Sequence, residues 1–361
     1  MLEKIPAISV IIPMYNAEKY IVQCLGSLAI QTFKEYEVIV VDYRSTDRSF
    51  DIANQFVIQN LNKVGGGGQV IRRFTNSTNP NIPRNDGIKI SRGKYILFID
   101  SDDFILPNAL EELFKIAEEF QADIVHAEKW LQNRDGEEIN FNTAMVISSG
   151  TERSFVDKIT VDNNDLAERM IRYSQGYYFW HIWNNLYRRE FLIENNLKFS
   201  DVMYGGDAIF NFSCICRAKK FVRIPNIFSV HRVLEESVSH ISNKDIGKKI
   251  HKYLSFFIEL LKTIDEYLMS TEFFIENPQF KYMVFNFHLE FYFMIMDDIY
   301  SSFKPQDADL FIKKEFQARD SSTLSTFLFH TVNNFHKIIL NQQEQINNLN
   351  SLLRNEKLWK Q

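Results

Sequence analysis

An apolar run that ends in three carboxylates, YILFIDSDD at residues 95–103, restricts the possible folds of this chain more than any other segment. Such a run is typical of a strand buried on both faces of a parallel sheet. Ligands of open α/β sheets bind outside the carboxyl ends of these strands. Crowded carboxylates repel one another unless a cation lies between them, and hard divalent cations prefer oxygen ligands. The segment therefore indicates a metal site facing a phosphate-bearing ligand, or else acids that only cap the next helix.

Composition and charge set broad limits on the kind of protein. A chain of 361 residues is longer than a typical domain, so we expect one large domain and an appendage. The net charge of −5 does not mark a nucleic-acid binder, and we expect no nucleic-acid partner. Three cysteines, Cys24, Cys214 and Cys216, are too few for a disulfide framework. With neither a signal peptide nor a membrane-spanning segment in the sequence, we expect a cytoplasmic protein.

The first part of the chain alternates between strand and helix patterns. Strands are predicted at 8–12, 38–41 and 69–74, and helices at 17–30, 45–57, 83–90 and 107–120. Residues 183–192 look like the beginning of a further helix. Repeated β-α-β units predict an α/β fold with a mostly parallel, Rossmann-like sheet flanked by helices.

The last third of the chain has a different pattern. We divide the chain into a domain at 1–240, an aromatic-rich helical domain at 241–330 and an amphipathic helix at 331–361. Apolar residues of the final segment have the a/d spacing of a short coiled coil, which favours a homo-oligomer over a helix packed on its own domain. A lysine cluster leaves two alternatives open, peripheral contact with the inner face of a membrane or a solvated helix face. Its members are Lys244, Lys248, Lys249, Lys252 and Lys262.

Several segments resemble, in the same order, the motifs of family 2 glycosyltransferases of the GT-A fold. The resemblance covers about residues 7–240. The matching segments are 8–16 ("VSVIIPxYN"), 41–47 ("VDDGSTD"), 84–87 ("ARNxG"), 93–103 ("GxYixFlDsDD"), 185–192 ("KLYRREFL"), 204–210 ("yGEDxxF") and 231–239 ("YR…GSxS"). Each motif is weak alone, whereas the ordered set is specific.

The resemblance implies an inverting, metal-dependent transfer of a sugar from a nucleotide sugar, with a UDP-sugar as the expected donor. The acceptor would be a glycan, a lipid-linked molecule or a glycoprotein. Mn²⁺ or Mg²⁺ would neutralise the departing diphosphate. Asp102 would bind the metal, and Asp100 would share it near the ribose. His231 would add a nitrogen ligand or touch phosphate, although a packed core histidine fits the sequence equally well.

The remaining donor contacts also follow from the resemblance. Asp42 would accept a hydrogen bond from the nucleotide base, and Pro13 and Tyr15 would shape the base pocket. Arg84 would reach the diphosphate, with Ser101 on the donor side of the strand-end motif. The alternatives are that Asp42 only caps a turn and that Arg84 pairs with a surface acid.

The resemblance also implies a base that deprotonates the acceptor hydroxyl. Asp207 matches the catalytic aspartate of the family, although a carboxylate at a helix start is commonly an N-cap. Trp183 and Tyr187 would line the acceptor side, where aromatic rings stack on sugars. As core residues of an amphipathic segment they would produce the same sequence pattern.

Four positions depart from the family pattern. Tyr43 and Arg44 replace the second aspartate and the glycine of "DDGS", Asn185 replaces a lysine, and Gly206 replaces the glutamate of "GED". These departures leave room for a non-catalytic glycan-assembly scaffold. A sugar nucleotidyltransferase is a more distant alternative, because residues 13–16 lack the glycine-rich loop of those enzymes.

Overall fold

The computed structural model describes residues 5–62, 67–73, 79–135, 145–148, 156–178, 181–202, 205–234, 246–302 and 305–317. The chain forms two compact units, Met1–Ser242 and Asn243–Gln361. The predicted coiled coil at 331–361 lies outside the described residues and stays a prediction. The same holds for Lys244 and for the "GSxS" part of the last motif.

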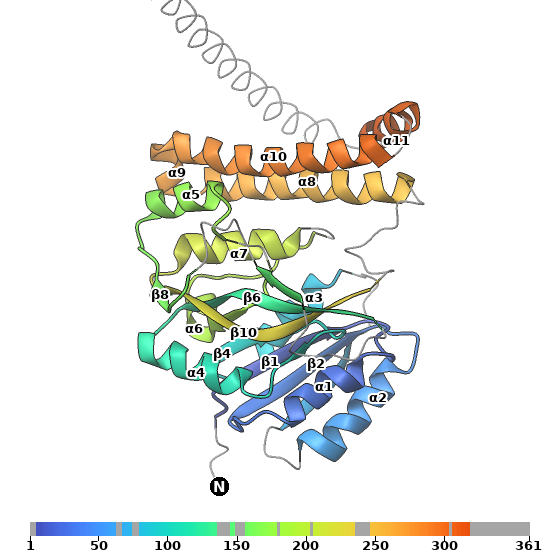
Figure 1. Ribbon diagram of the computed structural model, residues 1–361, viewed down its shortest axis with the longest axis vertical. Helices are drawn as coiled ribbons and strands as arrows, with labels where there is room; N and C mark the ends of the chain where they lie inside the picture. Colours follow the sequence, from blue (N-terminus) through green and yellow to red (C-terminus); the bar gives the residue numbers. More distant parts are fainter. Residues whose placement is uncertain are drawn as a thin grey trace, which may run out of the picture. The chain divides into compact units, whose positions relative to one another are not determined.

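The first unit is built on one sheet with ten strands among the described residues, eight of them in the order β3-β2-β1-β4-β9-β6-β10-β5. Its first four strands are mutually parallel (Figure 1). They are β1 (Ile8–Met14), β2 (Tyr36–Tyr43), β3 (Gly68–Arg73) and β4 (Tyr95–Phe98). This half agrees with the parallel sheet predicted from the β-α-β pattern.

The second half of the sheet is mixed. β9 (Asn185–Arg188) lies antiparallel between β4 and β6 (Ile124–Arg134), and β10 (Phe221–Val233) is parallel to β6. Three short strands pair antiparallel at this side, β5 (Phe104–Ile105), β7 (Met145–Ser148) and β8 (Thr160–Val161). Residues 183–192 were predicted to begin a helix, and that prediction is wrong for 185–188. Pairing with strands on both sides outweighs the helical pattern of so short a segment.

Helices cover the sheet and carry part of the candidate site. Their bounds are α1 (Ile21–Ala29), α2 (Ser49–Phe56) continued by the π-helix η1 (Val57–Leu61), α3 (Asn81–Ile90), α4 (Ala109–Phe120), α5 (Leu166–Ser174), α6 (Arg189–Glu194) and α7 (Gly206–Arg217).

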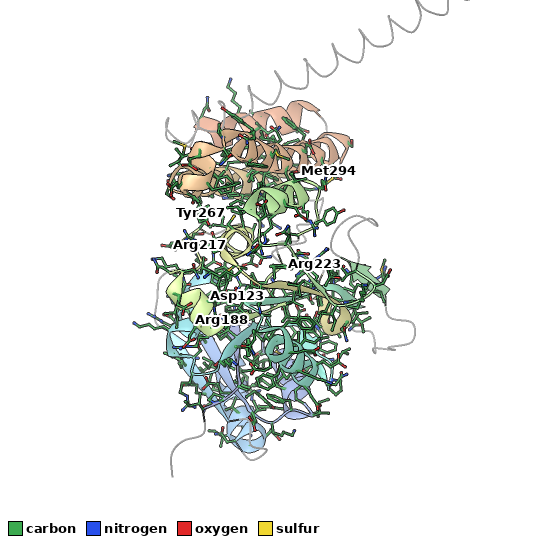
Figure 2. The ribbon with its side chains drawn as sticks, turned by 90° about the vertical axis from the view of Figure 1, so that its left-hand side faces the viewer. Asp123, Arg188, Arg217, Arg223, Tyr267 and Met294 are labelled. Atoms are coloured by element: carbon green, nitrogen blue, oxygen red, sulfur yellow. The ribbon has the colours of Figure 1, made fainter. Side chains whose placement is uncertain are left out.

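In Figure 2, Asp123 lies beside Arg188 of β9, and the closest oxygen and nitrogen atoms are 2.8 Å apart. This pair fixes β9 next to the start of β6.

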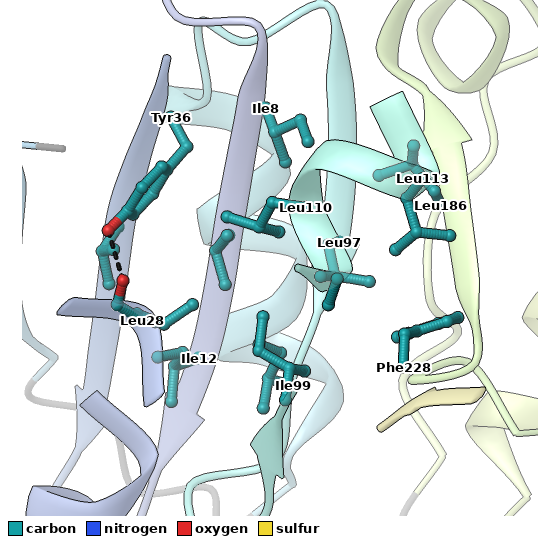
Figure 3. Close-up of a cluster of buried hydrophobic side chains, with 14 of the residues drawn as sticks. Ile8, Ile12, Leu28, Tyr36, Leu97, Ile99, Leu110, Leu113, Leu186 and Phe228 are labelled. Atoms are coloured by element: carbon teal, nitrogen blue, oxygen red, sulfur yellow. Dashed lines mark hydrogen bonds between the residues drawn. The ribbon is translucent and has the colours of Figure 1, made fainter. Parts of the chain in front are cut away.

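The core of the first unit lies around the parallel strands (Figure 3). Ile8, Ile12 and Leu97 from the strands and Leu110 from α4 are fully buried. The Tyr36 hydroxyl donates to the Leu28 carbonyl oxygen over 2.5 Å, which ties β2 to α1. All four residues of β4 are buried, so the prediction of a strand covered on both faces is confirmed.

Two glycines of the predicted motifs are required by close packing. A Cβ added at Gly87 would lie 2.3 Å from Ile11 Cγ2, and one at Gly93 would lie 2.5 Å from the Ser9 nitrogen. A larger residue at 87 would push α3 away from β1, and one at 93 would separate β1 from the segment that leads into β4. Both glycines therefore help to place the carboxyl ends of β1 and β4.

The second unit is helical where it is described. Its helices are α8 (Ile246–Met269), α9 (Glu272–Glu276), α10 (Pro278–Ser302) and α11 (Pro305–Gln317). Two lysines of the predicted basic cluster are buried, because Lys249 is 5% exposed and pairs with Asp298, and Lys252 is 9% exposed. In the part of the chain that the structure covers, no helix has the length and apolar character needed to cross a bilayer.

Candidate active site

The acidic segment forms a turn just beyond the carboxyl end of β4. The Asp103 amide donates to the Asp100 carbonyl oxygen over 3.0 Å, and Ser101 and Asp102 lie within this turn. The end of β10 fixes the turn, because the Arg232 amide donates to Asp103 Oδ1 (2.8 Å) and Arg232 Nε donates to the Asp102 carbonyl oxygen (2.9 Å). The predicted gathering of acids at this sheet edge is therefore present.

The carboxylates of this turn differ in their electrostatic surroundings. Burial, together with the charges of Asp103 and Asp100, raises the pKa of Asp102 to about 7. Burial alone would lower the pKa of His231, but its ion pair with Asp103 (Nδ1–Oδ2 3.0 Å) raises that pKa to about 9. His231 is thus a cation at neutral pH, and it neutralises Asp103. Asp102 is the carboxylate that lacks such compensation and would gain most from a bound cation.

Arg84 joins two parts of the site. Its Nη2 lies 3.0 Å from Asp100 Oδ1 and its Nη1 lies 2.7 Å from Asp207 Oδ1. The Arg84 side chain is 6% exposed, and the acids it pairs with are two carboxylates of the candidate site. Both carboxylates raise the pKa of Arg84 against the opposing effect of burial. The α3 helix thus brings a permanent positive charge between the β4 turn and the α7 helix.

Asp207 lies in the first turn of α7, as predicted. It does not cap the helix: the N-cap is Gly205, in the left-handed region with φ 79°, and no side chain makes a capping hydrogen bond there. The Asp207 side chain instead points at Arg84 and keeps 34% of its surface exposed. Partial burial raises the pKa of this carboxylate, and the Arg84 guanidinium limits the increase.

The residues predicted to hold the base lie at the ends of β1 and β2. Asp42 is fully buried, and its Oδ2 lies 3.3 Å from Arg72 Nε. Within the described residues Asp42 Oδ1 has no hydrogen-bond partner, so an acceptor is left unused in a buried place. Tyr15, 40% exposed, stacks on Tyr43 with ring centroids 5.3 Å apart. Pro13 is register partner of Val41, next to Asp42.

The residues predicted for the acceptor side lie deeper than expected. Trp183 is 6% exposed, and its ring stacks on the rings of His181 (centroids 4.5 Å apart) and His231 (5.1 Å). Tyr187 is fully buried and packs edge-on against Phe98 at 5.9 Å. In this conformation a sugar cannot reach the ring of Tyr187, so its position does not support an acceptor role. The antiparallel strand β9 turns this residue into the core.

The surroundings of two of the four departures are clear: they explain Asn185, whereas nothing in the structure explains an arginine at position 44. Arg44 has φ 71°, a left-handed conformation that favours the glycine of the family motif. Asn185 is fully buried and bonds His126 Nδ1 (2.6 Å) and the Tyr187 hydroxyl (2.7 Å). This polar network takes the place of the family's lysine and lies in the core.

Three residues beside the predicted site were missed or given no role in the sequence interpretation: Arg72, Asn81 and Arg232. Arg72 could have been found, because it is the β3 register partner of Asp42 in the parallel sheet. Asn81 carries no signal in the sequence, since its contacts depend on how α3 meets the chain before α7.

The carboxylates fit a divalent cation that is held jointly with a ligand. No three His, Cys, Asp or Glu side chains among the described residues form a complete metal cage by themselves. Mg²⁺ and similar ions are commonly bound by one or two carboxylates together with substrate phosphates and waters. Asp102 and Asp100 match that requirement. The predicted metal role of His231 stays a prediction, and its Nδ1 is bonded to Asp103.

A comparison with protein families gives a match over the first part of the chain. Residues 9–194, more than half of the chain, match the model of Glycosyl transferase family 2. The chain belongs to this family. The match extends from β1 through the acidic turn after β4 to the end of α6.

Named relatives are bacterial glycosyltransferases. One is the poly(ribitol-phosphate) beta-glucosyltransferase of Bacillus spizizenii, 34% identical over 238 residues, which are 65% of this chain and 33% of that protein. The S. aureus TarS crystal structure has a TM-score of 0.57 at 25% identity, covering 79% of this chain and 44% of TarS. TarS 1–349 in complex with UDP-GlcNAc has a TM-score of 0.51 at 20% identity, covering 84% and 83%.

These likenesses confirm a GT-A-type α/β fold followed by C-terminal helices. The chain spans only about a third of the Bacillus relative and less than half of the TarS chain in that crystal structure.

Proposed function

We propose that this chain is an inverting, metal-dependent glycosyltransferase that moves a sugar from a UDP-sugar to a hydroxyl of a glycan, lipid-linked or glycoprotein acceptor. Membership of the family supports the reaction class. UDP-GlcNAc bound to TarS supports the donor class, and the Bacillus relative adds polyol-phosphate polymers to the acceptors worth testing. The observation that carries the proposal is the Arg84 bridge between Asp100 and Asp207.

The donor would lie across the carboxyl ends of β1, β2 and β4. Asp42 Oδ1, buried and without a partner among the described residues, would accept the imide N–H of uracil. The exposed ring of Tyr15, backed by Tyr43, would pack on the base. Arg84 would donate to the diphosphate, because a planar guanidinium suits phosphate oxygens.

Asp100 and Asp102 would hold Mn²⁺ or Mg²⁺ together with the diphosphate. When bound, the cation neutralises charge that develops on the departing diphosphate. Because Asp103 is paired with His231, Asp102 is the carboxylate best suited to this ion.

Asp207 would act as the base. Its carboxylate takes the proton of the acceptor hydroxyl while the acceptor oxygen bonds to the anomeric carbon of the sugar. The bond between that carbon and the β-phosphate oxygen breaks, and its electron pair stays on the nucleotide diphosphate. A raised pKa suits a group that must accept a proton, and the Arg84 guanidinium opposes the increase that burial causes.

The test is a comparison of Asp207→Asn with Asp165→Asn. Asp165 is a true N-cap, since it accepts from the Glu168 amide over 2.8 Å at the start of α5. We expect Asp207→Asn to bind UDP-sugar normally in the presence of Mn²⁺ and to lose transfer about 1,000-fold or more. Asp165→Asn keeps an oxygen that can accept the capping hydrogen bond, so stability and turnover number should change little. Unchanged turnover in Asp207→Asn would refute the assigned role.

A further inference from the structure

The side chain of Asn81 occupies the space in which a side chain at position 206 would lie. The family motif has glutamate at this position, and this chain has glycine. A Cβ added at Gly206 would lie 2.1 Å from Asn81 Nδ2 and 2.6 Å from Asn81 Cγ. Gly206 does not have a positive φ, so no special backbone conformation demands glycine there. The reason for glycine is the close approach of the Asn81 amide to the first turn of α7.

Asn81 is held by hydrogen bonds to the segment before α3 and to the segment before α7. It is 2% exposed, its Nδ2 donates to the Val202 carbonyl oxygen over 2.8 Å, and its backbone amide donates to Asn79 Oδ1 over 2.9 Å. Asn79 Nδ2 in turn donates to Asp201 Oδ1 over 2.9 Å. Two asparagines at the start of α3 therefore fix the segment just before α7.

Asn81 also contacts the charged centre of the site. Its Oδ1 accepts a hydrogen bond from Arg84 Nη1 over 3.3 Å, and the same Nη1 donates to Asp207 Oδ1 over 2.7 Å. One nitrogen of Arg84 is thus directed by an amide oxygen and a carboxylate oxygen together. Without the Asn81 amide, Asp207 alone would direct this nitrogen of Arg84.

We propose that Asn81 is a positioning residue that sets the catalytic carboxylate of Asp207 relative to Arg84, and that Gly206 is glycine to admit it. The proposal rests on the base role of Asp207 given above. Asn81 touches neither donor nor acceptor in this proposal and acts only through Arg84 and α7. In this chain the pair Asn81 and Gly206 replaces the side chain that the family carries at position 206.

The test is a double-variant cycle with Gly206→Ala, Asn81→Ala and the two combined, measured as kcat, KM for the donor and the dissociation constant for UDP with Mn²⁺. We expect each single variant to lower kcat about tenfold, with the dissociation constant for UDP unchanged within about threefold. The combined variant should be no slower than Asn81→Ala alone, because the steric conflict at 206 has gone.

A steric control is Gly68→Ala, whose Cβ would lie 2.8 Å from Val57 Cγ1, away from Arg84. It should lower the melting temperature and leave kcat within about twofold. Two results overturn the inference: wild-type kcat in Asn81→Ala and Gly206→Ala, or a combined variant in which the two losses multiply. If the wild-type protein transfers no sugar, the proposed function fails and this inference fails with it; if only the Asn81 and Gly206 results fail, the proposed function stands.

Discussion

Arg84 and Asp207 are 123 positions apart in the chain and form an ion pair with 2.7 Å between Nη1 and Oδ1. The other terminal nitrogen of Arg84 reaches Asp100 over 3.0 Å. One guanidinium therefore connects the turn proposed to hold the metal with the carboxylate proposed to act as base. A diphosphate that binds at Arg84 would therefore affect both Asp100 and Asp207.

Replacement of Arg84 by lysine should lower kcat/KM at least about 100-fold. An ammonium is a point charge and cannot donate in a fixed fork to Asp100 and Asp207 at once. Steady-state kinetics with a UDP-sugar measures the loss. The control is Arg73→Lys, since Arg73 is half-exposed and pairs with Asp86. Equal activity of the two variants would show that the bridge by Arg84 is dispensable.

The Asp42→Asn variant should weaken the donor about tenfold, as a higher KM, while kcat changes little. The substitution keeps the shape of the side chain but removes the charge that faces Arg72. If the amide oxygen stays at Arg72, an NH₂ donor replaces the unused acceptor Oδ1 and cannot accept the N–H of the base. Asp51→Asn, an exposed position in the first turn of α2, is the matched control. A loss in kcat with unchanged KM would argue against a role in binding the base.

At position 44, a glycine should stabilise the protein relative to an alanine by about 1 kcal/mol. Arg44 has φ 71°, where a β-carbon is unfavourable. Both variants lose the guanidinium, so their difference isolates the backbone term. Chemical denaturation gives both free energies of unfolding. Equal values would mean that the left-handed conformation costs nothing here.

The stability of the protein should decline as the pH falls from about 6.5 to about 4, in part because of His126. Burial lowers the pKa of this residue to about 4 in the folded protein, although Asn185 opposes the shift. The unfolded chain binds a proton near its ordinary pKa of 6.5, so acid favours unfolding across that range. The contribution is on the order of 2–3 kcal/mol. His126→Gln should flatten the pH dependence of the free energy of unfolding, and an unchanged slope would contradict this explanation.

The sequence was sufficient for the parallel half of the sheet and for the acids after β4. These features are visible in short stretches of sequence, as long apolar runs and as ordered motifs. The motif glycines Gly87 and Gly93 lie where the packing has no room for a β-carbon. It failed at β9, where four residues are strand only because β4 and β6 lie on either side. For Tyr187 the sequence left an acceptor role and a core position open, and the strand turns its side chain into the core.

Several acidic residues of the candidate site were named from the sequence, whereas their connections were not. Asp102, Asp100 and Asp207 were named from motifs, whereas the Arg84 link to Asp207 and the Asn81 contact with Gly206 join segments more than 100 residues apart. Such contacts depend on the angle at which α3 meets α7, and a single sequence carries no pattern for that angle. His231 was likewise named as a metal ligand without any sign of its ion pair with Asp103.

Calorimetric titration of UDP, with and without Mn²⁺, into the wild-type chain and into Asp102→Asn tests the central claim most directly. A nucleotide held through a cation at the β4 turn should bind the wild-type chain at least about tenfold more tightly with Mn²⁺, and Asp102→Asn should abolish that gain. UDP that binds equally well in both chains and without any metal would contradict the account.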